Sequence, residues 1–254
     1  MGAVLIDFIF KRKQINVECF VNSHRIATTY PIRKSIHYIP EWWKKLDAKY
    51  YAPHKLTNKP YEHPTVKSCY GIVELYKAGL IMPLWSDTDI FLEKTEEEAS
   101  YSYQAVSESV RIAQHHPDEY GNNFKDFHHM KLVSPWILRE RSGVQFMFIP
   151  CTWSHLAEAP EIRVVPGIVN YKHQHTTNVN WFVPHTNAYF RLEAGLPLVQ
   201  MIPLTDKKIK ISTHVLDSLE YEKLRTTMHH HKFRVGFQKV VKENRCPMGG
   251  SSND

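Results

Sequence analysis

Histidines are the first residues of this sequence that suggest chemistry. The 254-residue chain contains 16 of them. His173 and His175 are spaced so that, on a strand, both side chains would lie on one face and reach one metal ion. Asn180 stands where a carboxylate ligand would be needed to complete the set. Because two histidines alone leave most of the coordination shell to water, we predict no metal at this pair and no bound cofactor.

Other groups of histidines have spacings that are poorer still for metal binding. Adjacent side chains point in different directions in a helix or a strand, which applies to His115 with His116 and to His128 with His129. The run 229–231 lies near the end of a predicted helix, where cationic side chains favour the helix dipole. We therefore predict surface and capping roles for these histidines.

The sequence contains no complete motif of the common enzyme classes. It has no H-E-x-x-H pair, no serine nucleophile elbow, no phosphate loop of the G-x-x-x-x-G-K-S type and no dinucleotide glycine fingerprint. The sequence leaves the question of enzymatic activity open and favours a non-catalytic role.

The elements that would position these residues are mainly strands. Between 131 and 215, short apolar segments alternate with turns at close spacing, which is typical of a compact barrel or sandwich. The expected strands are 132–138, 144–150, 162–165, 179–183, 189–192, 198–204 and 208–215. Alternation predicts that one core is shared by the side chains of Val144, Phe146, Phe148, Val164, Leu198 and Ile202.

Helices are expected near both ends of a single domain spanning 1–254. Strands at 4–10 and 16–22 suggest an opening hairpin, and Pro40 favours a short helix after it. A second helix at 66–78 would end at Gly79 and lead into strands at 80–85 and 88–92. Near the other end, Asp217 would cap a helix over 217–228. The stretch 93–126, which includes the acidic run 96–98, is expected to be an irregular insertion, and 247–254 a mobile tail.

Composition sets limits on partners and location. Lysine and arginine exceed aspartate and glutamate by 32 to 26, a formal charge of +6, but the basic residues are scattered, so nucleic acid is not an expected partner. Four widely spaced cysteines indicate reduced thiols. The apolar run at the start precedes its basic residues, the reverse of a signal peptide, so we do not expect secretion. No segment is long and apolar enough to cross a membrane.

Two glycine-containing segments carry a resemblance to a known superfamily. The segment 165–171, V-P-G-I-V-N-Y, and the segment 195–203, G-L-P-L-V-Q-M-I-P, resemble the P-G-[IV]-[IV]-D and G-x-x-[IL]-[AV]-Q motifs of the dUTPase and dCTP-deaminase superfamily. That resemblance implies a β-clip-like barrel or sandwich with a ligand pocket between the two glycine turns. The implied ligand-binding residues are Gly167, Asn170, Tyr171, His173, Gly195 and Gln200.

Most of residues 35 to 215 also resembles a family of proteins encoded by tailed phages of marine bacteria. The matching segments are 39–44 (I-P-E-W-W-K), 66–69 (V-K-S-C), 79–84 (G-L-I-M-P-L) and 134–136 (S-P-W), together with the two glycine segments. This resemblance implies a phage protein, located in the virion or the host cytoplasm.

Departures from the superfamily motifs affect the predicted function. Asn170 replaces the aspartate that would activate water, and an amide cannot act as a base. His173 replaces the stacking tyrosine, and the segment 151–153, C-T-W, occupies the place of the phosphate-binding R-S-S. The resulting hypothesis is a non-catalytic phage protein, a structural or assembly component that contacts other virion proteins or itself. The alternative is a nucleotide- or small-molecule-binding protein derived from a dUTPase-like enzyme.

Overall fold

The computed structural model describes residues 14–94, 101–107, 109–121, 123–155 and 162–231. With 44% strand and 21% helix, the fold is mainly β, as predicted. The described strands form five sheets, of five, four, three, three and two strands, and they form no closed barrel. Residues 131–215 were expected to form a compact barrel or sandwich; the barrel form is not observed, because strands of this region pair with strands from the first half of the chain. Among the described residues, no helix has the length and apolar character to span a membrane.

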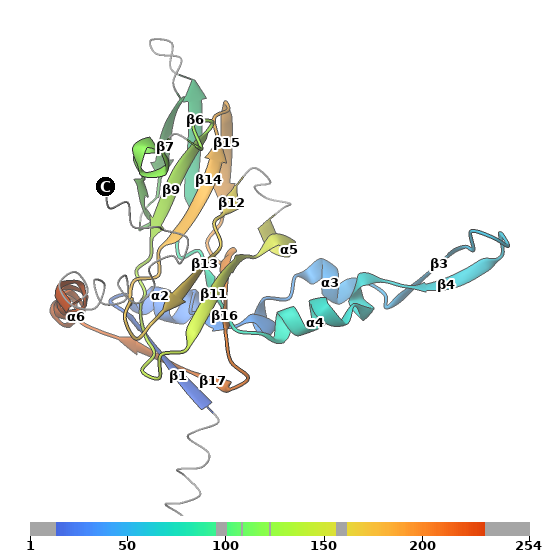
Figure 1. The fold of residues 1–254 in the computed structure, drawn as a ribbon, viewed down its shortest axis with the longest axis horizontal. Coiled ribbons are helices and arrows are strands. Elements are labelled where there is room, and N and C mark those ends of the chain that lie inside the picture. Colours follow the sequence, from blue (N-terminus) through green and yellow to red (C-terminus); the bar gives the residue numbers. More distant parts are fainter. Residues whose placement is uncertain (1–13, 95–100, 108, 122, 156–161, 232–254) are drawn as a thin grey trace, which may run out of the picture.

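The central sheet has five antiparallel strands in the order β13-β11-β16-β5-β2 (Figure 1). These strands are β13 (Gly167–Asn170), β11 (Gln145–Pro150), β16 (Pro197–Pro203), β5 (Leu80–Pro83) and β2 (Arg33–Lys34). The two segments that carry the superfamily resemblance, β13 and β16, flank β11 on either side. They therefore belong to one sheet, although successive side chains of each strand lie on opposite faces of that sheet.

Two further sheets extend from the centre toward the top of Figure 1. The four-stranded sheet has the order β12 (Arg163–Val164), β14 (Val179–Pro184), β9 (Phe127–Val133) and β8 (Arg111–Gln114). The three-stranded sheet has the order β15 (Ala188–Leu192), β6 (Thr88–Lys94) and β7 (Tyr101–Val106). The region 93–126, expected to be irregular, thus contains β7, β8 and a 3-10 turn, η3 (Pro117–Tyr120).

A second three-stranded sheet lies at the lower end in Figure 1. Its order is β10 (Ile137–Arg139), β1 (Gln14–Val21) and β17 (Lys208–Val215), with β1 and β17 parallel. Beside it lie α2 (His24–Thr29), capped by Ser23, and α6 (Ser218–His231). As predicted, Asp217 caps α6: its carboxylate accepts a hydrogen bond of 2.8 Å from the N–H of Glu220.

Residues 41–77 form an arm that projects away from the sheets (Figure 1). After η1 (Ser35–Tyr38), the arm contains α3 (Glu41–Lys45), the hairpin of β3 (Lys49–Pro53) and β4 (Pro60–Pro64), η2 (Val66–Ser68) and α4 (Tyr70–Lys77). The helix after Pro40 is confirmed. The helix expected over 66–78 is divided at Cys69 into η2 and α4, and Gly79 has the left-handed φ of 69° expected after a helix end. The hairpin between them was not predicted.

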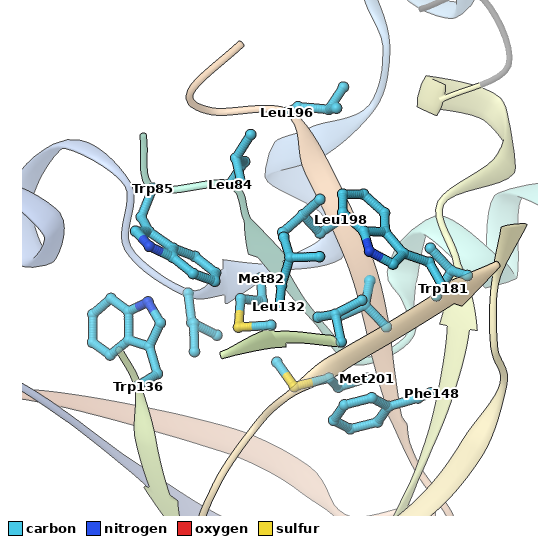
Figure 2. Close-up of a cluster of buried hydrophobic side chains, with 14 of the residues drawn as sticks. Met82, Leu84, Trp85, Leu132, Trp136, Phe148, Trp181, Leu196, Leu198 and Met201 are labelled. Carbon is cyan, nitrogen blue, oxygen red and sulfur yellow. The ribbon is translucent and has the colours of Figure 1, made fainter. Parts of the chain in front are cut away.

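Large aromatic side chains from distant segments fill the core (Figure 2). Trp85, Trp136 and Trp181 come from different parts of the chain and are each at most 1% exposed. Of the six side chains predicted to share a core, four are buried there, namely Phe146, Phe148, Val164 and Leu198, and Val144 packs against the core partly buried.

Ile202 departs from that prediction. It pairs with Met147, whereas Met201 pairs with Phe148, so Ile202 lies on the face of the central sheet opposite Phe146 and Phe148 and is only half-buried.

Other sequence predictions differ at element boundaries or fall outside the described residues. The expected strand at 132–138 is divided between β9 and β10, because Pro135 lies between them and carries no N–H for a strand ladder. The predicted strand 4–10, the acidic run 96–98 and the tail 247–254 lie outside the described residues.

Candidate functional site

Asn170, which was expected to stand in place of an aspartate, is built into a turn. It ends β13, and its side-chain N–H donates to the carbonyl oxygen of Gly143 at 3.2 Å. Its side-chain oxygen accepts from the N–H of Lys172 at 3.0 Å. Gly167 begins the same strand and has open space around its Cα, and His173 is exposed in the following turn. Both ends of the Asn170 amide therefore hold the chain in place.

Tyr171 belongs to the core. Its side chain is completely buried, and its hydroxyl donates to the sulfur of Met201 at 3.2 Å. Its ring lies 5.3 Å from that of Phe146, and burial raises the pKa of its hydroxyl well above the usual value. Nearby, Nδ1 of His175 lies 2.9 Å from the carbonyl oxygen of Leu138, a contact that uses one of its ring nitrogens.

Gln200 and Gly195 lie apart from this turn. The Gln200 side chain is buried on the other face of β16, where its amide nitrogen contacts Ser35 Oγ at 3.1 Å and two carbonyl oxygens at the end of α4, those of Leu75 at 2.7 Å and Ala78 at 2.8 Å. Gly195, with φ of 94°, makes the turn into β16, and its N–H donates a hydrogen bond of 2.7 Å to the carbonyl oxygen of Leu84. The structure thus brings Asn170, Tyr171 and His173 into one turn and places Gln200 and Gly195 elsewhere.

Gln200 lines a small cleft, of about 160 Å³, under the root of the arm. Cys151 lies in its wall, and burial raises the pKa of this thiol well above its usual value, so it remains protonated and weakly nucleophilic. Burial also raises the pKa of Tyr76 in the same cleft to about 12. The segment 151–153, expected at the place of the superfamily's phosphate-binding motif, therefore presents a buried thiol to this cleft.

We expect the chain not to hydrolyse dUTP or deaminate dCTP. An amide at position 170 cannot remove a proton from water, and loss of a general base typically lowers a rate by about 10² to 10⁴. Incubation with either nucleotide and magnesium is expected to release no pyrophosphate or ammonia above a blank. The variant Asn170→Asp is expected to remain inactive, because the turn holds both ends of this side chain. Turnover by the unaltered chain at ordinary enzyme rates would contradict this prediction.

Four histidines gather around the four-stranded sheet. The rings of His115 and His129 stack with centroids 4.4 Å apart, and those of His128 and His185 lie at the same separation. The surface role predicted for His128 and His129 is wrong: they are 3% and 7% exposed, and burial lowers the pKa of each to about 4. Within the described ranges, no group of three or more potential metal ligands is assembled. The His128 and His129 imidazoles are therefore neutral at neutral pH, and all four rings pack against aromatic neighbours.

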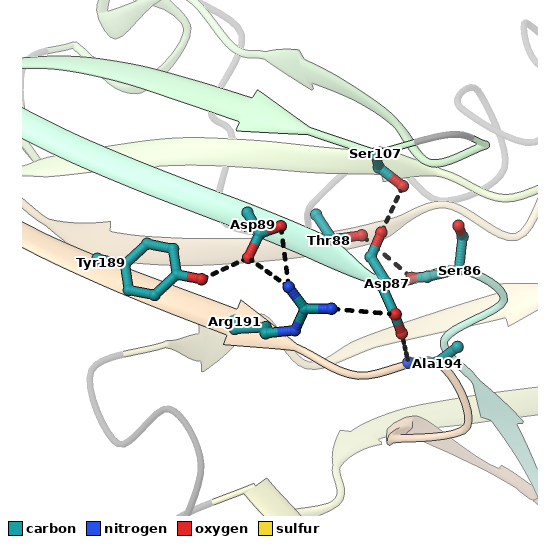
Figure 3. A network of polar contacts seen from close by, with 8 residues as sticks. All are labelled: Ser86, Asp87, Thr88, Asp89, Ser107, Tyr189, Arg191 and Ala194. Carbon is teal, nitrogen blue, oxygen red and sulfur yellow. Dashed lines mark hydrogen bonds and ion pairs between the residues drawn. The ribbon is translucent and has the colours of Figure 1, made fainter.

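A second polar cluster joins β6 to β15 (Figure 3). Arg191 lies between two carboxylates, 3.3 Å from Asp87 and 3.5 Å from Asp89. Tyr189 donates to Asp89 at 2.6 Å, and the backbone N–H of Ala194 donates to Asp87 at 2.8 Å. Since Arg191 and Asp89 are direct cross-strand partners, this cluster fixes the pairing of two strands and the turn that follows them.

The arm presents exposed aromatic side chains, including Tyr50, Tyr51 and Tyr61. Four rings follow one face of the hairpin, and we call them the aromatic face: His54, Tyr61, His63 and Tyr50. Successive centroids are 5.6, 5.0 and 5.3 Å apart. Every residue of β3 and β4 except Ala52 and His63 is exposed, and Leu56 at the tip is 90% exposed.

Tryptophans anchor the root of the arm to the body. The buried ring of Trp43 packs edge-on against Tyr76 at 5.8 Å, and the ring of Trp42 lies 5.8 Å from that of Trp153. Trp153 belongs to α5 (Thr152–His155), so this contact joins the arm to a helix of the body. The Tyr-rich segments on either side of T-N-K-P at 57–60 are the sequence signal from which the hairpin was predictable.

No protein-family model matches the chain, and no curated protein is significantly similar to it.

Proposed function

We propose that this chain is a non-catalytic structural or assembly component of a phage particle and that its arm docks on another protein of that particle. The observation that carries the proposal is the aromatic face of the arm, exposed on a hairpin that projects from the body. Tyrosine rings are enriched in protein interfaces because they bring large rigid contact areas at low entropic cost.

The low stability expected of an isolated hairpin supports a binding partner for the arm. A two-stranded hairpin is marginally stable in water unless another layer covers one of its faces. The other face of the arm carries an ion pair between Lys49 and Glu62. The hydroxyl of Tyr51 also donates a hydrogen bond to the Glu62 carboxylate at 3.1 Å. Those two charges offset each other on that face.

Prolines determine how the arm can dock. Pro53, Pro60 and Pro64 lie in the two strands of the hairpin, and proline has no N–H to offer an added strand. Docking through the aromatic face is therefore favoured over extension of the hairpin by a third strand.

We propose a β-clip-like relationship to the dUTPase superfamily, supported by the position of the two motif segments, β13 and β16, on either side of β11. Asn170, bonded at both ends, supports loss of the ancestral chemistry. In the alternative function, binding of a nucleotide or small molecule, the ligand would contact Gly167 at the start of β13 and the turn that Asn170 and His173 form at its end.

The arm is tested by removing two of its rings. Replacing Tyr50 and Tyr61 by serine is expected to lower the amount of this chain in purified particles at least about tenfold, because buried interface aromatics contribute about 2 kcal/mol each. Particles would be prepared from hosts infected with the encoding phage carrying the altered gene. Mass spectrometry would measure the chain relative to the other particle proteins.

The matched control removes two exposed leucines from the body, Leu204→Ser and Leu219→Ser, and is expected to leave the incorporation unchanged. Normal incorporation of the arm variant would exclude the arm as the docking surface. Absence of the unaltered chain from both particles and assembly intermediates would overturn the proposed function itself.

A further inference from the structure

A cleft of about 650 Å³ lies between the exposed edges of two sheets. On one wall is β2, the last strand of the central sheet, with η1 after it; on the other is β17, the last strand of its own sheet. Basic and aliphatic side chains from both walls line it. The cleft follows β17 from Lys208 to Thr213, a length of about 17 Å at 3.3 Å per residue.

The charge of this cleft is uniformly positive. Arg33, Lys34, Lys208 and Lys210 line it, and no aspartate or glutamate does. None of these four cations forms an ion pair with another described residue. Close cations without counter-charges repel one another, so a bound anion would relieve that repulsion.

A second cleft, of about 300 Å³, continues the first and shares Lys34, Lys208 and Ile209 with it. It adds Lys207 and Lys77, the latter bonded to Glu74 at 2.9 Å. The cations thus form a track that is longer than a single phosphate group requires. They come from segments far apart in the sequence, which is why the basic residues looked scattered there.

The apolar residues of the cleft limit what it can recognise. Its floor is aliphatic, formed by Ile32, Ile209 and Ile211, and the lining contains no tryptophan, tyrosine or phenylalanine. Recognition of single-stranded bases commonly uses stacking on such rings. The cleft is therefore suited to contact a chain of phosphates and not to read bases.

We infer that this basic cleft binds the sugar-phosphate backbone of nucleic acid without sequence specificity. Neutralised phosphates release condensed counterions, and the number of contacts sets the salt dependence of binding. With four unpaired cations at the cleft, the logarithm of the association constant should fall against the logarithm of salt concentration with a slope of about −3 to −4. The inference is independent of docking by the arm, so the variant with Tyr50→Ser and Tyr61→Ser is expected to bind nucleic acid normally.

The test is fluorescence anisotropy on the full chain with a labelled single strand of about 20 nucleotides and with the duplex of the same sequence. The variant with Lys208→Ala and Lys210→Ala is expected to bind at least about tenfold more weakly and to reduce the salt slope by about 2. Unrelated sequences should bind equally well. The better-bound probe, single strand or duplex, identifies the form that the cleft accepts.

The control variant removes the same formal charge elsewhere, by Lys172→Ala and Lys223→Ala, which do not line the cleft. It is expected to bind like the unaltered chain. Equal weakening by both variants would show an effect of net charge alone and overturn the inference. Absence of binding at low salt, or equally tight binding of poly-glutamate under the same conditions, would overturn it as well. Thermal melting of each variant checks that the fold is retained.

Discussion

Replacing Gly79 by alanine is expected to destabilise the folded protein by about 3 to 5 kcal/mol. Gly79 has φ of 69°, where a side chain is strained, and it lies directly against β16. A Cβ at this position would be 2.1 Å from the carbonyl oxygen of Met201 and 2.9 Å from the Cα of Ile202. Both contacts are with backbone of the central sheet, which cannot move without breaking its pairing with β5 and β11. Urea denaturation followed by circular dichroism measures the loss.

Gly71→Ala is the matched control for this substitution. Gly71 lies in the first turn of α4, no atom lies within 4 Å of its would-be Cβ, and its φ is not positive. Alanine is the better helix former, so we expect a gain of up to about 1 kcal/mol. A loss of less than about 1 kcal/mol for Gly79→Ala would contradict the close approach of Gly79 to β16.

The strands were predictable where their residues form local patterns. The segment Q-F-M-F-I-P of β11 and the segment V-N-W-F-V-P of β14 alternate or concentrate β-branched and aromatic residues between turns, which indicates strands at once. The pairing of the strands was not predictable, because the pattern of a strand indicates which of its faces is apolar and not which strand lies beside it. The parallel pairing of β1 with β17 joins the two ends of the described chain, and nothing in either segment specifies the other.

The candidate site was predictable to a smaller extent. The glycine segments correctly mark a turn and a strand in one sheet, but Gln200 points to the opposite face from Met201 and bonds to α4. The basic cleft escaped detection because Arg33 and Lys34 meet Lys208 and Lys210 only after folding. The run D-K-K-I-K at 206–210 was the available signal, since alternate lysines on a strand share one face.

Glu140 shows how a structural role can be hidden in a charged turn sequence. In R-E-R-S-G it has the appearance of a solvated residue, yet it is 2% exposed. One carboxylate oxygen accepts from the N–H and the hydroxyl of Ser142, and the other accepts from the N–H of Gly143 at 2.8 Å and of Val144 at 3.0 Å. Since Asn170 donates to the carbonyl of Gly143, this carboxylate also supports the turn at Asn170.

Glu140→Gln is therefore expected to destabilise the protein by about 2 to 4 kcal/mol, although it preserves the size of the side chain. The amide of glutamine has one accepting oxygen, and its NH₂ group would face backbone N–H groups that also donate. Hydrogen bonds to a charged acceptor contribute about 1.5 to 3 kcal/mol each, and buried N–H groups left without an acceptor carry a similar cost. Urea denaturation is again the measurement.

The exposed carboxylate of Glu193 provides the matched control, and Glu193→Gln is expected to change the free energy of unfolding by less than about 0.5 kcal/mol. Hydrogen exchange distinguishes a local effect from a global one. In the Glu140→Gln variant the N–H groups of Gly143 and Val144 should exchange faster than those of β16, because the carboxylate that protects them is gone. If the variant were as stable as the unaltered chain, or if those two amides kept their protection, the carboxylate would not be what holds the turn between β10 and β11.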